Sequence, residues 1–366
     1  MREKPDGRLA EHGGNLRKAS EDYGMPADGW LDFSANINPL GLAESVRKSI
    51  LQRLEQIVNY PDPEAIECKQ AIAAHYALPC EQIVMGNGAV ELIYLLVHKL
   101  RPRRVLLPAP AFSEYARSVR AIDGEVVYFP LREADEFRLD VPEFIDLLRG
   151  VDMCFLCNPH NPVGNLLSRE ALEPIIAAAA RLSVPVVLDE SFIDFLPDAG
   201  RITCRQLVSR YDNLVIIHSL TKFFAMPGLR LGFGVMPAFL GRLLEAAKDP
   251  WNVNSLAQSA AVAALGDKQY SRETIRLIQE ENQFLYQELR TISGLSPYRP
   301  VANFLFMRLT HRRFNAVTLA DATARRGILI RDCSNYAGLA DAYIRVAVKR
   351  RADNRRLLSV LRDLLD

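Results

Sequence analysis

Residues 219–233 read SLTKFFAMPGLRLGF, and they directly follow the apolar run LVIIH at 214–218. The β-branched run predicts a buried strand, and Pro227 and Gly228 predict a loop beyond it. Lys222 is therefore expected just past the end of a buried strand, which is a poor place for a solvated lysine. A single lysine after a strand is most often an ordinary surface residue, so its neighbours have to decide between the two interpretations.

The neighbours of Lys222 are the residue types that a reactive amine and a phosphate need. Two apolar rings, Phe223 and Phe224, follow it, and desolvation lowers the pKa of a lysine and makes it a nucleophile toward carbonyl groups. Ser219 and Arg230 add a hydroxyl and a fixed cation, which bind phosphate well. An amine that reacts with aldehydes beside a phosphate site favours pyridoxal phosphate as the cofactor.

The arrangement S-x-x-K followed by G-L-R-x-G resembles the cofactor-lysine segment of the fold-type I pyridoxal phosphate enzymes, the aspartate aminotransferase superfamily. The resemblance implies that Lys222 is the catalytic lysine that carries the cofactor. It also implies that Ser219 and Arg230 bind the cofactor phosphate.

The composition indicates a two-domain enzyme that acts on a small molecule. The chain has 366 residues, 49% of them hydrophobic, and its 45 basic and 44 acidic residues leave a net charge of +1. No global field therefore favours nucleic acid or a membrane surface. The polar first residues, with no apolar segment behind them, predict neither a signal peptide nor a membrane span, and hence a cytoplasmic protein.

The six cysteines are expected to be free thiols, because no secretory signal accompanies them. Cys154 and Cys157 spell C-x-x-C, but they lie in the apolar run MCFLC, which predicts a buried strand. Strand alternation would point the two thiols to opposite faces, so neither a metal site nor a redox site is expected.

Strands and helices alternate from about residue 46 to about residue 240. Apolar runs predict strands near 83–85, 104–107, 125–129, 152–157, 184–188, 214–218 and 231–235. Helical patterns lie between them at 64–77, 89–99, 112–121, 141–149 and 168–182. Single helices between short strands require crossover connections, so the sequence predicts a large α/β domain over 46–240. Its sheet of seven strands should be mostly parallel, with ligands in the loops at the strand ends.

The two ends of the chain have a different character. Residues 1–45 are rich in Gly, Asn and Pro and are interpreted as an arm that packs near the active site and the smaller domain. Residues 241–366 predict a smaller α+β domain. Its expected elements are a long helix at 269–292, strands near 303–309, 328–331 and 343–348, and a charged helix from about 350.

Two of the predicted loops could contribute to a cofactor site. The segment GNGA at 86–89 places backbone N–H groups at the start of a helix, where they can bind an anion. Most such triplets are only turns, but the resemblance implies that Gly88 and Ala89 hold the cofactor phosphate. Phe112 falls where the superfamily stacks an aromatic ring on the pyridine, and helix-start packing is the alternative.

Two polar residues follow the next strands. Asn161 lies in NPHNPVG at 158–164, a tight loop that would aim its side chain at the cofactor's 3′-oxygen, unless the Asn-Pro pair is only a turn. Asp189 ends an apolar strand, where a carboxylate needs a partner. A protonated pyridine nitrogen would serve, because the ion pair keeps the ring electron-withdrawing. A cap for the next helix or turn is the alternative role of Asp189.

Two arginines stand in or beside apolar strands near the C-terminus. Arg345 lies within YIRVAV at 343–348, and Arg331 ends the run GILI. A cation in such a strand is rarely left unpaired. The resemblance implies that Arg345 binds the substrate carboxylate and that Arg331 lies in a segment used by substrates that carry a phosphate.

Further motifs resemble one branch of the superfamily, the threonine-phosphate decarboxylases, cobalamin-pathway enzymes that make (R)-1-aminopropan-2-ol phosphate. They are HGGN at 12–15, DFSANINPLG at 32–41, YPD at 60–62, DESFIDF at 189–195, SLTKFFAMPGLRLG at 219–232 and N-Y-x-G-L at 335–339. The resemblance implies that a phosphorylated amino acid contacts His12, Gly13, Asn36, Asn161, Arg331 and Arg345. It also implies that Tyr60 reaches the cofactor phosphate of the partner subunit, in a homodimer with shared active sites.

Two positions depart from these patterns. Ala89 stands where the branch is expected to carry an acidic residue, and Phe192 stands where aminotransferases often carry a tyrosine that binds the 3′-oxygen. The missing hydroxyl weakens a plain transaminase interpretation. We therefore predict decarboxylation of L-threonine O-3-phosphate, with histidinol-phosphate aminotransferase as the alternative. A regulator that binds the cofactor without catalysis is disfavoured, because no extra segment with a basic DNA-binding face is present.

Overall fold

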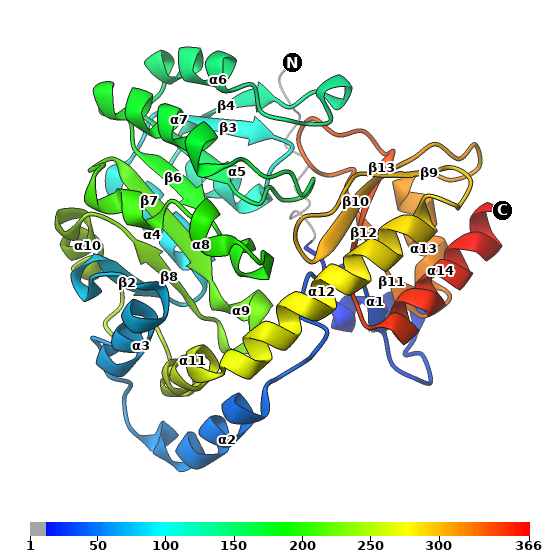
Figure 1. The fold of residues 1–366 in the computed structure, drawn as a ribbon, viewed down its shortest axis with the longest axis horizontal. Coiled ribbons are helices and arrows are strands. Elements are labelled where there is room, and N and C mark those ends of the chain that lie inside the picture. Colours follow the sequence, from blue (N-terminus) through cyan, green and yellow to red (C-terminus); the bar gives the residue numbers. More distant parts are fainter. Residues whose placement is uncertain (1–11) are drawn as a thin grey trace.

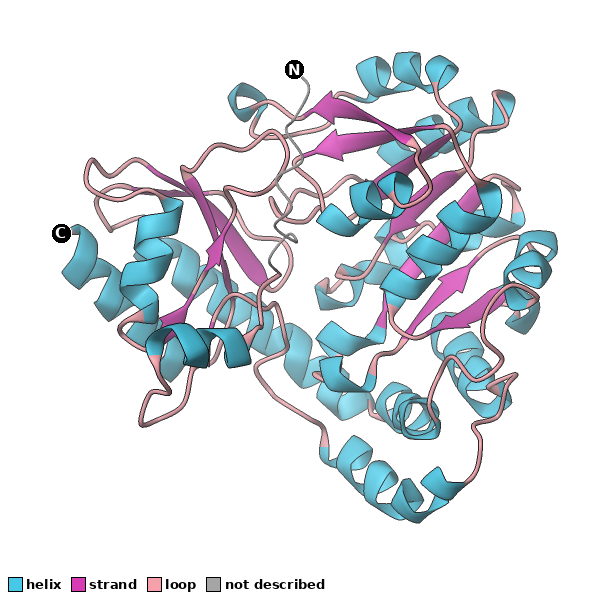
Figure 2. Ribbon diagram, turned by 180° about the vertical axis from the view of Figure 1, so that it is seen from behind, coloured by secondary structure: helices cyan, strands magenta, loops and turns pink. Residues whose placement is uncertain are grey.

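The computed structural model describes residues 12–366, which form two lobes built on separate sheets (Figures 1 and 2). The larger sheet has seven strands in the order β2-β8-β7-β6-β5-β3-β4. Their bounds are β2 (Ile83–Gly86), β3 (Arg104–Ala109), β4 (Glu125–Pro130), β5 (Met153–Cys157), β6 (Val186–Asp189), β7 (Leu214–Ser219) and β8 (Gly232–Val235). Only β8 runs antiparallel to its neighbours in this sheet. The predicted mostly parallel sheet of seven strands is therefore confirmed.

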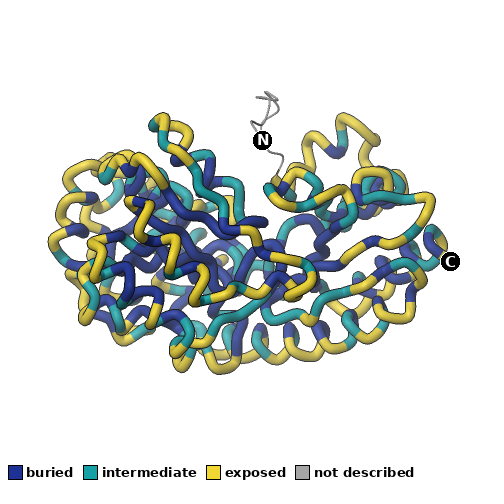
Figure 3. Tube along the Cα trace, turned by 90° about the horizontal axis from the view of Figure 1, so that it is seen from above, coloured by how far each residue is buried: buried dark blue, intermediate teal, exposed yellow. Residues whose placement is uncertain are grey.

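Helices cover both faces of this sheet, so its strands read as apolar runs rather than as alternating patterns. One face packs against α4 (Ala89–Leu100), α5 (Ser113–Arg120) and α10 (Ala238–Glu245). The other packs against α3 (Ile66–Tyr76), α6 (Val141–Leu147), α7 (Arg169–Arg181) and α11 (Ser255–Gly266). Figure 3 shows the buried chain running through the middle of the lobe, with the exposed helices outside it.

The two thiols of the C-x-x-C motif lie on opposite faces of β5. Cys154 belongs to one of the two apolar cores and Cys157 to the other. All six cysteines are free. The prediction of a strand with oppositely directed thiols is confirmed.

The smaller lobe holds a four-stranded antiparallel sheet in the order β12-β13-β10-β9. Its elements are β9 (Leu295–Pro297), β10 (Phe304–Leu309), β12 (Arg331–Asp332), β13 (Tyr343–Ala347), α12 (Lys268–Leu289), α13 (Ala316–Ala324) and α14 (Arg351–Leu365). The N-terminal arm adds α1 (Leu16–Tyr23) and β1 (Leu31–Asp32), and β1 pairs in parallel with β11 (Ile328–Leu329). The arm is thereby tied to the smaller lobe.

The single strand expected near 328–331 is in fact two short strands. β11 pairs with β1, whereas β12 joins the four-stranded sheet beside β13. Arg331 thus begins a strand of its own instead of ending the previous one.

The predicted domain limits at 45/46 and 240/241 remain predictions. α2 (Glu44–Arg53) spans the first limit. α10 and α11 pack on the larger lobe, and α12 runs from that lobe to the smaller one (Figure 1). Among residues 12–366, no helix combines the length and the apolar character needed to cross a membrane.

Candidate active site

The start of α4 forms an anion cradle against β8 and the segment that follows Lys222. A Cβ atom placed on Gly88 would lie 2.5 Å from Nη2 of Arg230, and one placed on Gly232 would lie 2.5 Å from the amide nitrogen of Ala89. Gly232 is the register partner of Ser219 at the end of β7. The predicted phosphate residues Gly88, Ala89, Ser219 and Arg230 are thus brought together. The Gly88 amide donates to the Gly86 carbonyl at 2.8 Å, so the helix start from Ala89 onward and the guanidinium are the groups that suit a phosphate dianion.

Lys222 follows Ser219 on the single turn α9 (Leu220–Phe223), as the strand-then-loop pattern predicted. Its Nζ lies 5.2 Å from the centre of the Phe192 ring and makes no hydrogen bond or ion pair within the described chain. Burial lowers the pKa of the Lys222 amine, and the nearby charge of Asp189 opposes that shift only in part. The amine is therefore closer to the neutral, nucleophilic form than an ordinary lysine.

Asp189 ends β6 and is 5% exposed. Its Oδ2 accepts a hydrogen bond of 2.6 Å from the Tyr115 hydroxyl, and its Oδ1 accepts one of 2.9 Å from the Ser191 amide. The second bond is a turn contact, as the alternative interpretation of Asp189 expected. Burial, with the charge of Asp189 beside it, raises the pKa of Tyr115 well above its usual value, so Tyr115 stays a hydrogen-bond donor.

Sequence reasoning missed Tyr115. The residue lies on α5, three positions after Phe112, and its ring stacks on Phe155 at 5.0 Å. The signal was a tyrosine one helical turn beyond the predicted stacking ring. Its partner Asp189 is 74 residues away, and nothing local in the sequence connects the two.

A buried cluster behind Asp189 fixes the loop between β6 and β7. Arg205 Nε lies 3.3 Å from Glu190 Oε2, and His218 Nε2 lies 2.8 Å from Asp194 Oδ2. Burial alone would raise the pKa of Asp194, but the charges and hydrogen bonds of His218 and Arg205 outweigh it and hold that pKa below its usual range. Because Glu190 follows Asp189 and His218 precedes Ser219, the cluster holds in place the strand ends that carry the predicted cofactor residues.

Phe112 is the N-cap of α5, and His12 of the arm lies beside it, with ring centres 5.8 Å apart. His12 Nε2 is 2.8 Å from Oε1 of the buried Glu114. Glu114 also accepts hydrogen bonds from Tyr94 and Arg117. Burial raises the pKa of Glu114, but these three partners outweigh it and lower the value to about 2. His12 thus lies beside the predicted stacking ring Phe112, as expected, and it is held there by the anionic carboxylate of Glu114. Sequence reasoning missed this role of Glu114.

Arg345 is 6% exposed and has only neutral partners within the described chain. It donates hydrogen bonds to Asn161 Oδ1 and, at 3.0 Å, to the Ser34 carbonyl, while its Nε is buried without a partner. The Asn161 oxygen is therefore occupied, and its Nδ2 group is left to donate to a ligand oxygen. Gly13 is needed where the arm crosses Ser34, because a Cβ there would lie 2.3 Å from the Ser34 carbonyl oxygen.

Arg331 and Arg345 are register partners on β12 and β13. Arg331 donates to Asn335 at 2.8 Å and lies over the Tyr336 ring, and neither arginine forms an ion pair with a described carboxylate. Like charges directly opposite each other destabilise a sheet unless an anion lies between them. Asn36, which was also predicted to contact the substrate, is buried two residues after Ser34. Its Oδ1 has no described hydrogen-bond partner.

Tyr60 stands apart from these residues. It is 79% exposed and stacks on Trp251 with ring centres 4.5 Å apart. Its predicted contact with the cofactor phosphate of a partner subunit stays a prediction.

These groups fit pyridoxal phosphate. The cradle at the start of α4 would hold the phosphate, the unpaired amine of Lys222 would meet the aldehyde, and Asp189 would face the ring nitrogen. Within residues 12–366 no cluster of side chains could hold a metal ion. The individual roles of these residues remain predictions.

Comparison with known proteins places this arrangement in a family. The family described as "Aminotransferase class I and II" matches residues 28–361. The threonine-phosphate decarboxylase of Salmonella typhimurium is 38% identical over 357 residues, which cover 97% of this chain and 96% of the relative.

Two solved structures resemble the fold. The histidinol-phosphate aminotransferase of Clostridium acetobutylicum has a TM-score of 0.85 at 31% identity, covering 91% of this chain and 98% of the other. The L-threonine-O-3-phosphate decarboxylase of Porphyromonas gingivalis has a TM-score of 0.81 at 27% identity, covering 92% and 99%.

Proposed function

The chain belongs to the class I and II aminotransferase family, and within it we propose that the protein is a threonine-phosphate decarboxylase that uses pyridoxal phosphate. The reaction removes the carboxylate of L-threonine O-3-phosphate as CO₂ and leaves (R)-1-aminopropan-2-ol O-2-phosphate. We assign this product to cobalamin biosynthesis, for which one relative of the chain is named.

The observation that supports this substrate is a pair of arginines, Arg331 and Arg345, that form no ion pair within residues 12–366. Arg345 is buried and Arg331 faces it across the strand pair, and the cofactor phosphate already has its own cradle at Gly88 and Arg230. Each buried charge needs a charge-assisted partner. A substrate with both a carboxylate and a phosphate supplies two anionic groups, whereas histidinol phosphate supplies only one.

The chain's own residues account for binding and proton transfer. The helix start at Gly88 and Ala89, with Ser219 and Arg230, would hold the cofactor phosphate, and Asp189, oriented by Tyr115, would keep a proton at the ring nitrogen. When bound, pyridoxal phosphate supplies a cationic ring that withdraws electrons from the substrate Cα.

The arginines decide which bond at Cα breaks. Arg345 and Arg331 would fix the anionic ends of the substrate and thereby present the bond from Cα to the carboxylate, rather than the bond to the α-hydrogen, for cleavage. Lys222, held above the Phe192 ring, then delivers a proton to Cα after CO₂ has left. If the α-hydrogen occupied that position instead, the same lysine would act as a base and the outcome would be amino transfer.

We also propose that the active protein is a homodimer. The segment from α2 through η1 (Leu54–Val58) exposes a group of apolar side chains that ends at Tyr60. They are Leu51, Leu54, Ile57 and Val58, with Val58 85% exposed. Exposed apolar patches of this kind are typical of an interface, and the segment carries the residue expected to serve the partner's site.

The test is an assay with carboxyl-labelled phosphothreonine, with and without 2-oxoglutarate. Release of labelled CO₂ that does not depend on 2-oxoglutarate is expected. Glutamate formed from 2-oxoglutarate without CO₂ would overturn the proposal in favour of an aminotransferase, the activity named for the Clostridium structure.

A further inference from the structure

The carboxylate of Glu114 joins the arm to the larger lobe. The arm is tied to the smaller lobe by the pairing of β1 with β11, whereas Glu114 lies on α5 of the larger lobe. His12 Nε2 lies 2.8 Å from Glu114 Oε1 and so connects the two. The Glu114 side chain is only 7% exposed, but the His12 side chain is 45% exposed. The carboxylate is therefore part of the interior of the lobe, and the imidazole is the part that a ligand can reach.

The partners of Glu114 decide which nitrogen of His12 carries a hydrogen. Glu114 Oε1 also accepts a hydrogen bond of 2.8 Å from Arg117 Nη1, and its Oε2 accepts one of 2.9 Å from the Tyr94 hydroxyl. Burial opposes ionisation, but the three partners outweigh it and hold the pKa of Glu114 at about 2. An ionised carboxylate can only accept, so His12 donates to it through Nε2–H.

The other ring nitrogen of His12, Nδ1, makes no hydrogen bond with a described residue. In a neutral ring whose hydrogen is on Nε2, Nδ1 offers only a lone pair and cannot donate to an anion. In the imidazolium both nitrogens donate, and the Glu114 carboxylate then lies directly beside the cation. His12 therefore binds an anion through Nδ1 only when the ring carries its second proton.

The imidazole of His12 and the guanidinium of Arg331 line the same pocket, which has a volume of about 590 Å³. Its walls are the start of the arm, Ser34, one face of α13 and the segment 329–335. The other titratable side chains of the pocket have partners within the chain: Lys18 pairs with Asp22, Tyr23 donates to Asp321, and Asp332 accepts from Ser334. Glu114 itself does not line this pocket, so an anion that enters it meets the imidazole and the guanidinium together.

We propose that Glu114 positions His12 for the phosphate of the substrate. The carboxylate holds Nε2–H of the ring toward α5, and Nδ1–H of the imidazolium binds the phosphate beside Arg331. The inference rests on the proposed function, which supplies a substrate with a phosphate group. Glu114 then affects binding only through His12. Binding also weakens as pH rises, because the neutral ring has no hydrogen at Nδ1.

A carboxylate on the outside of the larger lobe provides a matched control for Glu114. Glu173 on α7 accepts hydrogen bonds from Arg210 and Tyr211, the same two types of donor, but among the described residues it has no histidine partner. Glu173→Gln therefore removes a carboxylate that is bonded to an arginine and a tyrosine, without touching the arm.

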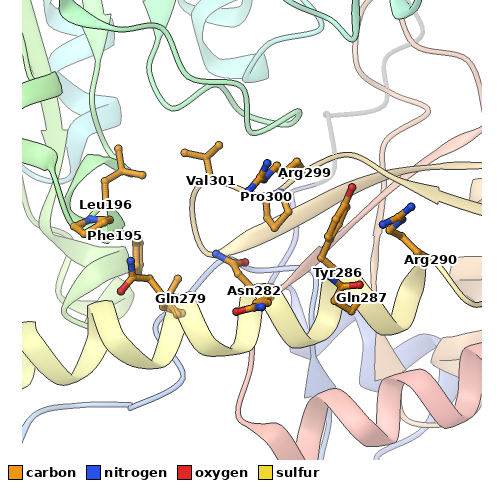
Figure 4. Close-up of a pocket in the computed structure, with 13 residues that line it drawn as sticks. Phe195, Leu196, Gln279, Asn282, Tyr286, Gln287, Arg290, Arg299, Pro300 and Val301 are labelled. Carbon is orange, nitrogen blue, oxygen red and sulfur yellow. The ribbon is translucent and has the colours of Figure 1, made fainter.

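A groove along α12 provides a matched control for the loss of a cation (Figure 4). Arg290 lies at the end of this groove, beside Tyr286, and does not line the pocket of His12 and Arg331. Arg290→Gln therefore removes a positive charge from the smaller lobe at a separate place.

The first experiment is a double-mutant cycle on the cofactor-loaded protein. KM for CO₂ release from phosphothreonine is measured for the wild type, Glu114→Gln, His12→Gln and the double variant. Glu114→Gln should raise KM about tenfold, the value of one charge-assisted hydrogen bond, but should change it less than about twofold when His12 is already glutamine. Glu173→Gln and Arg290→Gln should keep the KM of the wild type. Thermal unfolding verifies that each variant is folded.

The second experiment tests the same contact without turnover. Calorimetry measures the binding of inorganic sulfate to the cofactor-loaded protein at constant ionic strength between about pH 6 and pH 9. Sulfate keeps two charges throughout this range, so a change in its affinity comes from the protein. The affinity of the wild type should fall about tenfold as pH rises, and His12→Gln should remove most of that fall.

The proposal is overturned if Glu114→Gln raises KM by the same factor with and without His12, because the carboxylate would then act through the fold. Sulfate affinities that depend on pH equally in the wild type and in His12→Gln would overturn it as well. A wild type that releases no CO₂ would count against the proposed function instead, and the sulfate titrations would still decide the role of His12 and Glu114.

Discussion

Arg345→Gln tests whether the buried guanidinium exists for the substrate rather than for the fold. Among the described residues, this guanidinium bonds only to the Asn161 side chain and the Ser34 carbonyl, and its Nε has no partner there. Removal of one member of a buried charge-assisted pair costs about 2–5 kcal/mol. At about 1.4 kcal/mol per factor of ten, kcat/KM for CO₂ release from phosphothreonine should fall roughly 30- to 5,000-fold.

The stability of the ligand-free protein should respond far less. The substitution removes two hydrogen bonds of about 1 kcal/mol each, but it also removes a buried cation that forms no ion pair with a described residue, and the two effects oppose each other. The control is Arg308→Gln on β10, an exposed arginine that pairs with Glu133 at 2.8 Å. This variant should keep kcat/KM within about twofold of the wild type, since exposed ion pairs contribute only about 0–1 kcal/mol. An Arg345→Gln enzyme within threefold of the wild type would refute the reasoning.

Three further predictions concern the cofactor site and the dimer. Lys222→Met should prevent borohydride from fixing the cofactor to the protein. Because burial lowers the pKa of Lys222, the unfolded chain binds more protons than the folded chain, and the lysine therefore lowers the free energy of unfolding at pH 7. The variant should thus stabilise the ligand-free protein at pH 7, and this gain should shrink as pH rises toward 10.5. Urea titrations across that range check the sign. Tyr115→Phe removes the 2.6 Å hydrogen bond to Asp189 and should weaken cofactor binding by about tenfold, measured by equilibrium dialysis, whereas Tyr211→Phe, at a tyrosine that bonds Glu173 on the outer surface, should not. Sedimentation should show a dimer, and Tyr60→Ala should weaken cofactor binding in it; a fully active monomer would contradict the shared-site proposal.

Most strands of the larger lobe were predictable because they are buried on both faces and therefore stand out as continuous apolar runs; the edge strand β4 is only partly buried. The residues that directly follow those strands, such as Asn161 and Lys222, could be placed from the same runs. The division at 328–332 could not be predicted. Ile328 and Arg331 lie three residues apart and join different sheets, and that choice depends on β1 of the arm, almost 300 residues earlier.

Contacts between residues far apart in the chain could not be predicted from the sequence either. Tyr115 with Asp189 and His12 with Glu114 are separated by 74 and 102 residues, and each pair unites residues whose local patterns indicate only a helix start, a strand end or an arm. Asn161 was expected to point at a cofactor oxygen, and its position in the chain gives no sign that its carbonyl oxygen is taken by Arg345. Tertiary packing alone decides these pairs.

The sequence also contains the cations of the candidate site without revealing that neither Lys222 nor Arg345 forms an ion pair in the part of the chain that the structure describes. Lys222 and Arg345 could each have met an aspartate or glutamate, as Arg205 does in the cluster behind Asp189. The contrast between these neighbouring sites separates two uses of buried charge. Where the chain supplies its own carboxylates, the charges fix strand ends and the fold is complete without a ligand. Where it leaves a buried amine and a buried guanidinium without an ion pair to a described residue, it accepts a cost in stability that a ligand can remove, and such groups indicate a candidate site of chemistry.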